Sequence, residues 1–150
     1  MMRYYNEIVP YELSVELKTS GFDEVTMKCY GYDYHLVSSG GLNNTHLEHE
    51  YQLCHFKGAT LLISAPTFAD VFDWLFSKGI YIQTTPVNAI WDLWRKNIYY
   101  KHSEYAYKSL NPNANLSIES FIKDSCDSIR KALDIIKQEK EIEDEHNGNL

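Results

Sequence analysis

The pattern of apolar and polar positions is most regular in the middle of the chain, where it predicts a helix followed by a strand. Pro66 cannot donate to a strand ladder, and Thr67 with Asp70 three residues later has the spacing of a helix-starting capping box. The apolar side chains that follow recur at the spacing of one helical face: Phe68, Val71, Phe72, Leu75 and Phe76. Gly79 can adopt the positive φ that ends a helix, and Ile80-Tyr81-Ile82 then begins a strand.

Trp74 lies one or two positions from the centre of this apolar face, and two interpretations follow from that position. In the first, Trp74 is a residue at the edge of the core, with its ring flat on a sheet. In the second, the ring is exposed and anchors a partner, because tryptophan is enriched at the hot spots of interfaces. The nearness of the apolar face favours the first interpretation.

Two further helices are predicted near the ends of the chain. The first spans Pro10 to Gly21, with Leu13 and Leu17 on one face, and Phe22 after the glycine favours a Schellman-type end. The last begins after Ser117 and follows a continuous apolar face: Ile118, Phe121, Ile122, Ile129, Ala132, Leu133 and Ile136. Residues 138–150 are charged and lack such a face, so we expect an acidic, disordered tail there.

Between these helices, residues with high β-propensity predict strands over three stretches: Val25–Leu36, Glu50–Phe56 and Ala59–Ile63. The serine- and glycine-rich Ser38–Thr45 is expected to be a loop. Residues 87–100 fit either a helix with Pro86 in its first turn or two strands, and the aromatic residues that follow favour the strands.

The resulting order, α-β-β-α-β-β-α, predicts an α+β fold. Short links between strands imply one antiparallel sheet of about four to five strands, with the helices packed on one face. The length of 150 residues predicts a single domain over residues 1–137, followed by the tail at 138–150.

Composition narrows the environment and the class of partner. The net charge of −7 argues against a general binder of phosphate backbones. No apolar run approaches the ~20 residues of a membrane-spanning helix, and the first residues lack the apolar region of a signal peptide, so we expect a cytoplasmic protein that has no membrane partner. Three widely spaced cysteines, Cys29, Cys54 and Cys126, indicate free thiols rather than a disulfide framework.

The chain resembles a group of small phage and prophage proteins of gut Bacteroidetes. The resemblance covers most of the body and rests on these stretches: Ala65-Pro66-Thr67, Asp70-Val71, Asp73-Trp74-Leu75, Gly79-Ile80, the early helix from Leu13 to Phe22, and Ile129–Leu133 in the last helix. These residues are structural, so the resemblance implies an origin, with the host cytoplasm as location, and no mechanism.

The histidines are the strongest chemical signal in the sequence. His35, His46, His49 and His55 lie within a short stretch that also holds Cys54. Imidazole and thiolate are ligands suited to zinc, and His46 and His49 would share a face if they lay on a helix. Their order does not match a zinc-protease motif, and no second ligand pair has the spacing of a zinc finger. We therefore predict no cofactor, and His46, His49 and His55 stay weak metal candidates.

Aromatic and basic residues are interleaved after residue 90. The candidates for a partner-binding surface are Trp91, Trp94, Arg95, Lys96, Tyr99 and Tyr100. Tryptophan, tyrosine and arginine are typical of protein interfaces, whereas aromatics with cations also serve as platforms for single-stranded nucleic acids. A third interpretation is a sheet with one aromatic face in the core.

No catalytic constellation is visible in the sequence, so we expect a non-enzymatic protein that binds a macromolecule through this aromatic sheet region. A protein partner is favoured over nucleic acid because the chain is acidic. The alternatives are a single-stranded nucleic-acid binder, and a metal-binding protein or hydrolase that uses the His35–His55 region.

Overall fold

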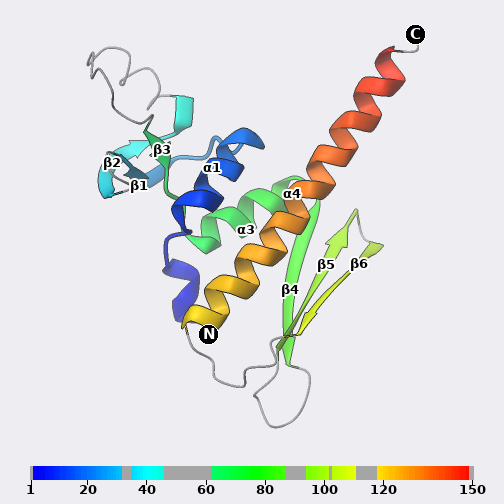
Figure 1. Ribbon diagram of the computed structural model, residues 1–150, viewed down its shortest axis with the longest axis horizontal. Helices are drawn as coiled ribbons and strands as arrows, with labels where there is room; N and C mark the ends of the chain where they lie inside the picture. The colour runs from blue at the N-terminus through cyan, green and yellow to red at the C-terminus, as the bar shows by residue number, and fades with distance from the viewer. Residues whose placement is uncertain are drawn as a thin grey trace. The chain divides into compact units, whose positions relative to one another are not determined.

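The computed structural model describes residues 2–31, 35–45, 62–86, 94–101, 103–110 and 118–148 (Figure 1). The chain divides into two compact units, Met1–Trp74 and Leu75–Leu150, and each unit is described by itself. Helices and antiparallel sheets follow one another along the chain, so the predicted α+β class is confirmed. The prediction of a single domain over residues 1–137 stays a prediction.

The first unit holds a short sheet with order β2-β1-β3, in which both strand pairs are antiparallel. Its elements are η1 (Met2–Asn6), α1 (Tyr11–Thr19), β1 (Thr26–Tyr30), β2 (Leu36–Leu42) and β3 (Ile63–Ser64), and α3 (Phe68–Ser77) begins here. The second unit holds β4 (Ile80–Pro86), β5 (Trp94–Tyr100), β6 (Ser103–Leu110) and α4 (Ile118–Gly148). Its sheet has the order β4-β5-β6 and is also antiparallel.

Among the described residues, the strands form two three-stranded sheets, where we expected a single sheet of four to five strands. The two sheets are separate because strands pair with their neighbours in the sequence. Strand β1 pairs with β2, and β4 pairs with β5. The strand alternative for residues 87–100 is confirmed over Trp94–Tyr100, while residues 87–93 lie outside the described residues. The strand predicted over Glu50–Phe56 also lies outside them.

Helix α1 ends in the predicted Schellman motif. Gly21 has a φ of 96°, and its N–H donates to the carbonyl of Lys18 at 3.1 Å. The N–H of Phe22 reaches back to the carbonyl of Leu17 at 2.9 Å, which is the outer bond of the motif. Leu17 and Phe22 are both buried, so the end of this helix also contributes two side chains to the core.

Helix α3 begins with the predicted capping box. The Thr67 N–H donates to Asp70 Oδ2 at 3.0 Å, and the Asp70 N–H donates to Thr67 Oγ1 at 3.1 Å. Two N–H groups that the helix itself cannot satisfy are therefore bonded reciprocally.

Replacing Thr67 with alanine should lower the free energy of unfolding by about 1 kcal/mol, because it removes the acceptor for the Asp70 N–H. Urea denaturation followed by circular dichroism measures this change. Asp73→Ala is the matched control, since Asp73 is an exposed residue of the same helix. Equal losses in the two variants would show that the cap contributes nothing specific.

Trp74 belongs to the core of the first unit. Its side chain is 3 % exposed, and its ring meets Phe22 edge-on with the centroids 5.4 Å apart. The interpretation of Trp74 as an exposed anchor is therefore wrong. The core interpretation is confirmed, although the aromatic partner lies edge-on and is a phenylalanine.

Strand β2 occupies most of the segment expected to be a loop. Leu36–Leu42 pairs with β1, with Val37 opposite Cys29, whereas we had continued one strand from Val25 to Leu36. A register shift near Thr26 and the φ of 83° at Gly41 let the glycine-rich stretch follow the ladder. Composition alone misplaced this strand because serine and glycine favour loops only where no neighbouring strand pairs with them.

Helix α4 runs 31 residues to Gly148, so residues 138–148 are helical where we expected a disordered tail. Lysine, glutamate and glutamine are strong helix formers, and Lys137 with Glu141 and Lys140 with Asp144 have the i, i+4 spacing of favourable pairs. An apolar face is therefore not needed to continue the helix. Among the described residues, no helix is both long and apolar enough to cross a membrane.

Candidate interaction surface

The residues predicted to bind a partner do not share one surface of strand β5. Trp94 and Arg95 begin the strand, Tyr99 and Tyr100 are half-buried near its end, and Lys96 is 1 % exposed. Trp91 lies outside the described residues. Since neighbouring residues of a strand point to opposite faces, Lys96 and Tyr99 lie on opposite faces of the sheet.

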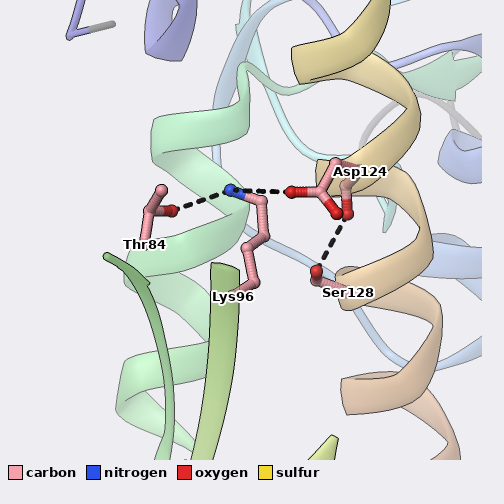
Figure 2. Close-up of polar contacts among 4 residues, drawn as sticks. All are labelled: Thr84, Lys96, Asp124 and Ser128. Carbon is pink, nitrogen blue, oxygen red and sulfur yellow. Dashed lines mark hydrogen bonds and ion pairs between the residues drawn. The ribbon is translucent and has the colours of Figure 1, made fainter. Parts of the chain in front are cut away.

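Lys96 is held in a polar contact between β4, β5 and α4 (Figure 2). Its Nζ donates to Thr84 Oγ1 at 2.8 Å and lies 3.8 Å from Asp124 Oδ2, as Figure 2 shows. The same Nζ lies 5.4 Å from the centre of the Phe121 ring. One turn further along α4, Ser128 Oγ donates to the backbone carbonyl of Asp124 at 2.8 Å.

Burial lowers the pKa of Lys96 from its ordinary value, and the negative charge of Asp124 opposes that shift. The side chain of Asp124 is 14 % exposed, so the pair lies at the edge of the interior. The prediction that Lys96 belongs to a partner-binding surface is therefore wrong. Its ammonium ties two strands to a helix, which the interleaving of cations and aromatics in the sequence did not reveal.

A set of aromatic rings lies on the other face of the sheet. Tyr81 of β4 and Tyr99 of β5 are direct partners in the strand register, with ring centres 6.2 Å apart and planes inclined at 32°. Phe76, at the end of α3, meets Tyr81 edge-on with the centroids 6.2 Å apart. We call Phe76, Tyr81 and Tyr99 the aromatic surface. Phe76 is 67 % exposed and Tyr81 is 49 % exposed, so two of its rings are open to solvent.

The aromatic surface borders a pocket of ≈ 500 Å³ that is also lined by Gly79 and Lys101. Two turns position these residues, because Gly79 has a φ of 83° and Lys101 has a φ of 48°. The Lys101 N–H donates to the Gly79 carbonyl at 3.1 Å, which joins the start of β4 to the end of β5. The pocket is therefore built where β4 starts and β5 ends, and a backbone hydrogen bond joins these two strand ends.

Lys101 adds a cation to the rim of this pocket. Its Nζ lies 4.9 Å from the centre of the Tyr100 ring and 3.8 Å from Glu139 Oε2. Contact with the side chain of Tyr100, and then the charge of Glu139, raises the pKa of Lys101. The ammonium is therefore charged at neutral pH, and Glu139 offsets part of its field.

Sequence reasoning missed Phe76 and Tyr81 as surface residues. Phe76 continues the spacing of the apolar face of α3, so it was assigned to the core with Phe68 and Leu75. Tyr81 carried a usable signal, since it lies between Ile80 and Ile82 in a strand, and alternation places it on the face opposite to theirs. Ile80 is fully buried, in agreement with that alternation.

Within the described ranges, no group of three or more histidine, cysteine, aspartate or glutamate side chains could hold a metal ion. His46, His49 and His55 lie outside those ranges, as does Cys54. Cys29 and Cys126 are buried and are not joined in a disulfide, which agrees with the prediction of structural thiols.

No protein-family model matches the chain, and no curated protein or solved structure matches it. Residue roles therefore cannot be transferred from a relative. What the protein does has to be inferred from the chemistry of its own surface. The aromatic surface is one place in the described residues where large apolar side chains are exposed, and Met27 and Val37 in the first unit are exposed as well.

Proposed function

We propose that the protein is a non-catalytic binding protein that contacts a macromolecular partner through the aromatic surface. The observation that supports this proposal is the exposure of Phe76 and Tyr81 beside a pocket lined by three aromatic rings. Large exposed apolar side chains in contact with one another are costly in water, and such patches mark interaction sites.

The chemistry of the surface favours a protein partner. Aromatic rings bury a large area with few rotatable bonds, and a tyrosine hydroxyl or the Lys101 ammonium can bond to polar groups at the rim. A nucleic-acid partner is less favoured, because phosphate contacts need accessible cations. Lys96 is buried and Lys101 is paired with Glu139. The net charge of −7 also disfavours binding to a nucleic-acid backbone.

The origin and location belong to the same proposal. We infer a phage or prophage protein that acts in the host cytoplasm, and the support is the resemblance carried by the residues of α3 and the flanking helices. A partner from the host or from the phage itself would then be available in the same compartment.

Photo-crosslinking tests the surface directly. A photoreactive phenylalanine analogue placed at Phe76 should trap one discrete partner from a bacterial lysate, and Tyr81→Ala should reduce that product at least ~5-fold, because loss of an interface aromatic commonly costs above 1 kcal/mol. The same analogue at Met27 is the matched control, since Met27 is 71 % exposed and lies outside the aromatic surface.

An identical set of crosslinked products from positions 76 and 27 would contradict the proposal. Fluorescence anisotropy with a labelled single-stranded oligonucleotide tests the alternative function, which is binding of single-stranded nucleic acid. Binding that weakens steeply with salt and is lost in Tyr81→Ala would identify a nucleic-acid platform instead.

A further inference from the structure

Among the described residues that line the pocket beside the aromatic surface, Lys101 is the one that carries a charge. Its side chain is 68 % exposed, so a bound partner can reach the ammonium at the rim. An ammonium has three N–H donors, and Glu139 Oε2 at 3.8 Å lies beyond the distance of a direct hydrogen bond. Together with its contact to Tyr100, the Lys101 ammonium therefore still has donors for a further acceptor.

The backbone at Lys101 has a conformation that lysine rarely adopts. Its φ of 48° lies in the left-handed region, which glycine and asparagine enter more easily. The hydrogen bond from the Lys101 N–H to the Gly79 carbonyl is a backbone bond, and a glycine at position 101 could form it equally well. The turn therefore does not explain why a lysine stands there. Strained residues of this kind are concentrated at binding and other functional sites.

The charges around the pocket select against a cationic ligand. Aromatic faces attract cations, but Lys101 already places a positive charge at the rim, where it would repel a second one. A ligand with a negative charge is attracted instead. The charges of Glu139 and Glu143 both act on Lys101, so they favour a ligand with a single negative charge over a doubly charged phosphate.

The backbone groups at the pocket separate two sources of a carboxylate. The C-terminal carboxylate of a chain is typically captured by several backbone N–H groups. Here the Lys101 N–H donates to the Gly79 carbonyl at 3.1 Å, and the Gly79 N–H donates to the Phe76 carbonyl at 3.0 Å. Neither N–H is open to such a ligand. A side-chain carboxylate, which one ammonium can bind, is therefore the better match.

We propose that Lys101 selects the partner by binding the carboxylate of an aspartate or glutamate, while an apolar side chain next to that residue enters the pocket lined by Phe76, Tyr81 and Tyr99. This pairing rests on the proposed function, and it adds the chemistry of the partner segment. The volume of ≈ 500 Å³ is that of a typical ligand pocket. Burial of the apolar side chain supplies affinity, and the carboxylate contact supplies selectivity.

Three small ligands with the same ring and different charges test this pairing on the full chain: 3-phenylpropanoate, 3-phenylpropanamide and 3-phenylpropylamine. An NMR titration follows the backbone amides of Gly79, Tyr81 and Lys101. The carboxylate should bind with a Kd of about 1–10 mM, as expected for a ligand of its size. The amide should bind at least ~3-fold more weakly, and the amine should bind most weakly.

Substitutions at position 101 test whether the ammonium causes this preference. Lys101→Gln should remove the preference for the carboxylate, and Lys101→Glu should reverse it in favour of the amine. Lys28→Gln and Lys28→Glu are matched controls, because Lys28 is an exposed lysine of β1 that does not line the pocket. They change the net charge of the chain by the same amounts and should keep the preference. Equal binding of the three ligands, or titrations that never saturate, would overturn the proposal.

Crosslinking from position 76 extends the test to the macromolecular partner. Lys101→Glu should reduce the crosslinked product at least ~5-fold, whereas Lys28→Glu should leave it unchanged. A product that persists in Lys101→Glu would overturn the role of Lys101 and leave the proposed function intact. The absence of any discrete product from the otherwise unaltered chain, together with a carboxylate preference that Lys101→Gln removes, would contradict the proposed function and support the chemistry of the pocket.

Discussion

Replacing Phe68 with alanine should lower the free energy of unfolding by about 3–5 kcal/mol, the range for removing a fully buried phenylalanine. Phe68 is 0 % exposed, its ring lies 6.5 Å from that of Phe72, and its backbone N–H donates to the carbonyl of Glu7 at 3.0 Å. The substitution removes the ring but keeps that backbone bond. The lost burial and the residual cavity therefore account for the change, which urea denaturation followed by circular dichroism measures.

The same helix supplies a matched control. Phe76→Ala removes an identical side chain two turns later on the same apolar spacing, but Phe76 is 67 % exposed. It should cost less than about 1 kcal/mol, because little buried area is lost. Equal costs at the two positions would mean that Phe76 is packed in solution, and the aromatic surface would then lose its most exposed ring.

The elements that the sequence predicted well are those governed by local rules. The capping box of Thr67 and Asp70, the positive φ of Gly79, and the Schellman end at Gly21 with Phe22 each depend on residues within one or two turns. Such features do not need the rest of the fold to be known. The fold class followed from the order of these elements.

The candidate site was predicted less well because burial is decided by distant partners. From its neighbours in the sequence, Lys96 was predicted to lie on a basic, aromatic surface. Its ammonium is instead fixed by Thr84 and Asp124, which lie 12 and 28 positions away. Phe76 belonged by its spacing to the core, yet no described element covers it. Hydrophobic spacing predicts which residues share a face of a helix, but it does not predict how far along the helix that face is covered.

Replacing Thr84 with valine should lower the free energy of unfolding by about 2 kcal/mol at neutral pH, because the buried Lys96 ammonium loses its acceptor at 2.8 Å. The valine keeps the shape of the side chain, so packing changes little. In a Lys96→Met background, the same substitution should cost less than about 0.5 kcal/mol, since no ammonium is left without a partner. A double-mutant cycle by urea denaturation measures this coupling, and equal costs in the two backgrounds would contradict it.

The pH dependence of stability gives a second readout of the same ammonium. Burial lowers the pKa of Lys96 in the folded protein, so the unfolded chain binds this proton more tightly. Between the lowered folded pKa and the ordinary value of 10.5, the unfolded state is protonated and the folded state is not. The stability of the unaltered protein relative to Lys96→Met should therefore rise with pH across that window, by at most about 1.4 kcal/mol per pH unit. Below the window, the cost of burying the charge is present in full, and a flat difference between the two proteins up to pH 10.5 would show that Lys96 is not desolvated.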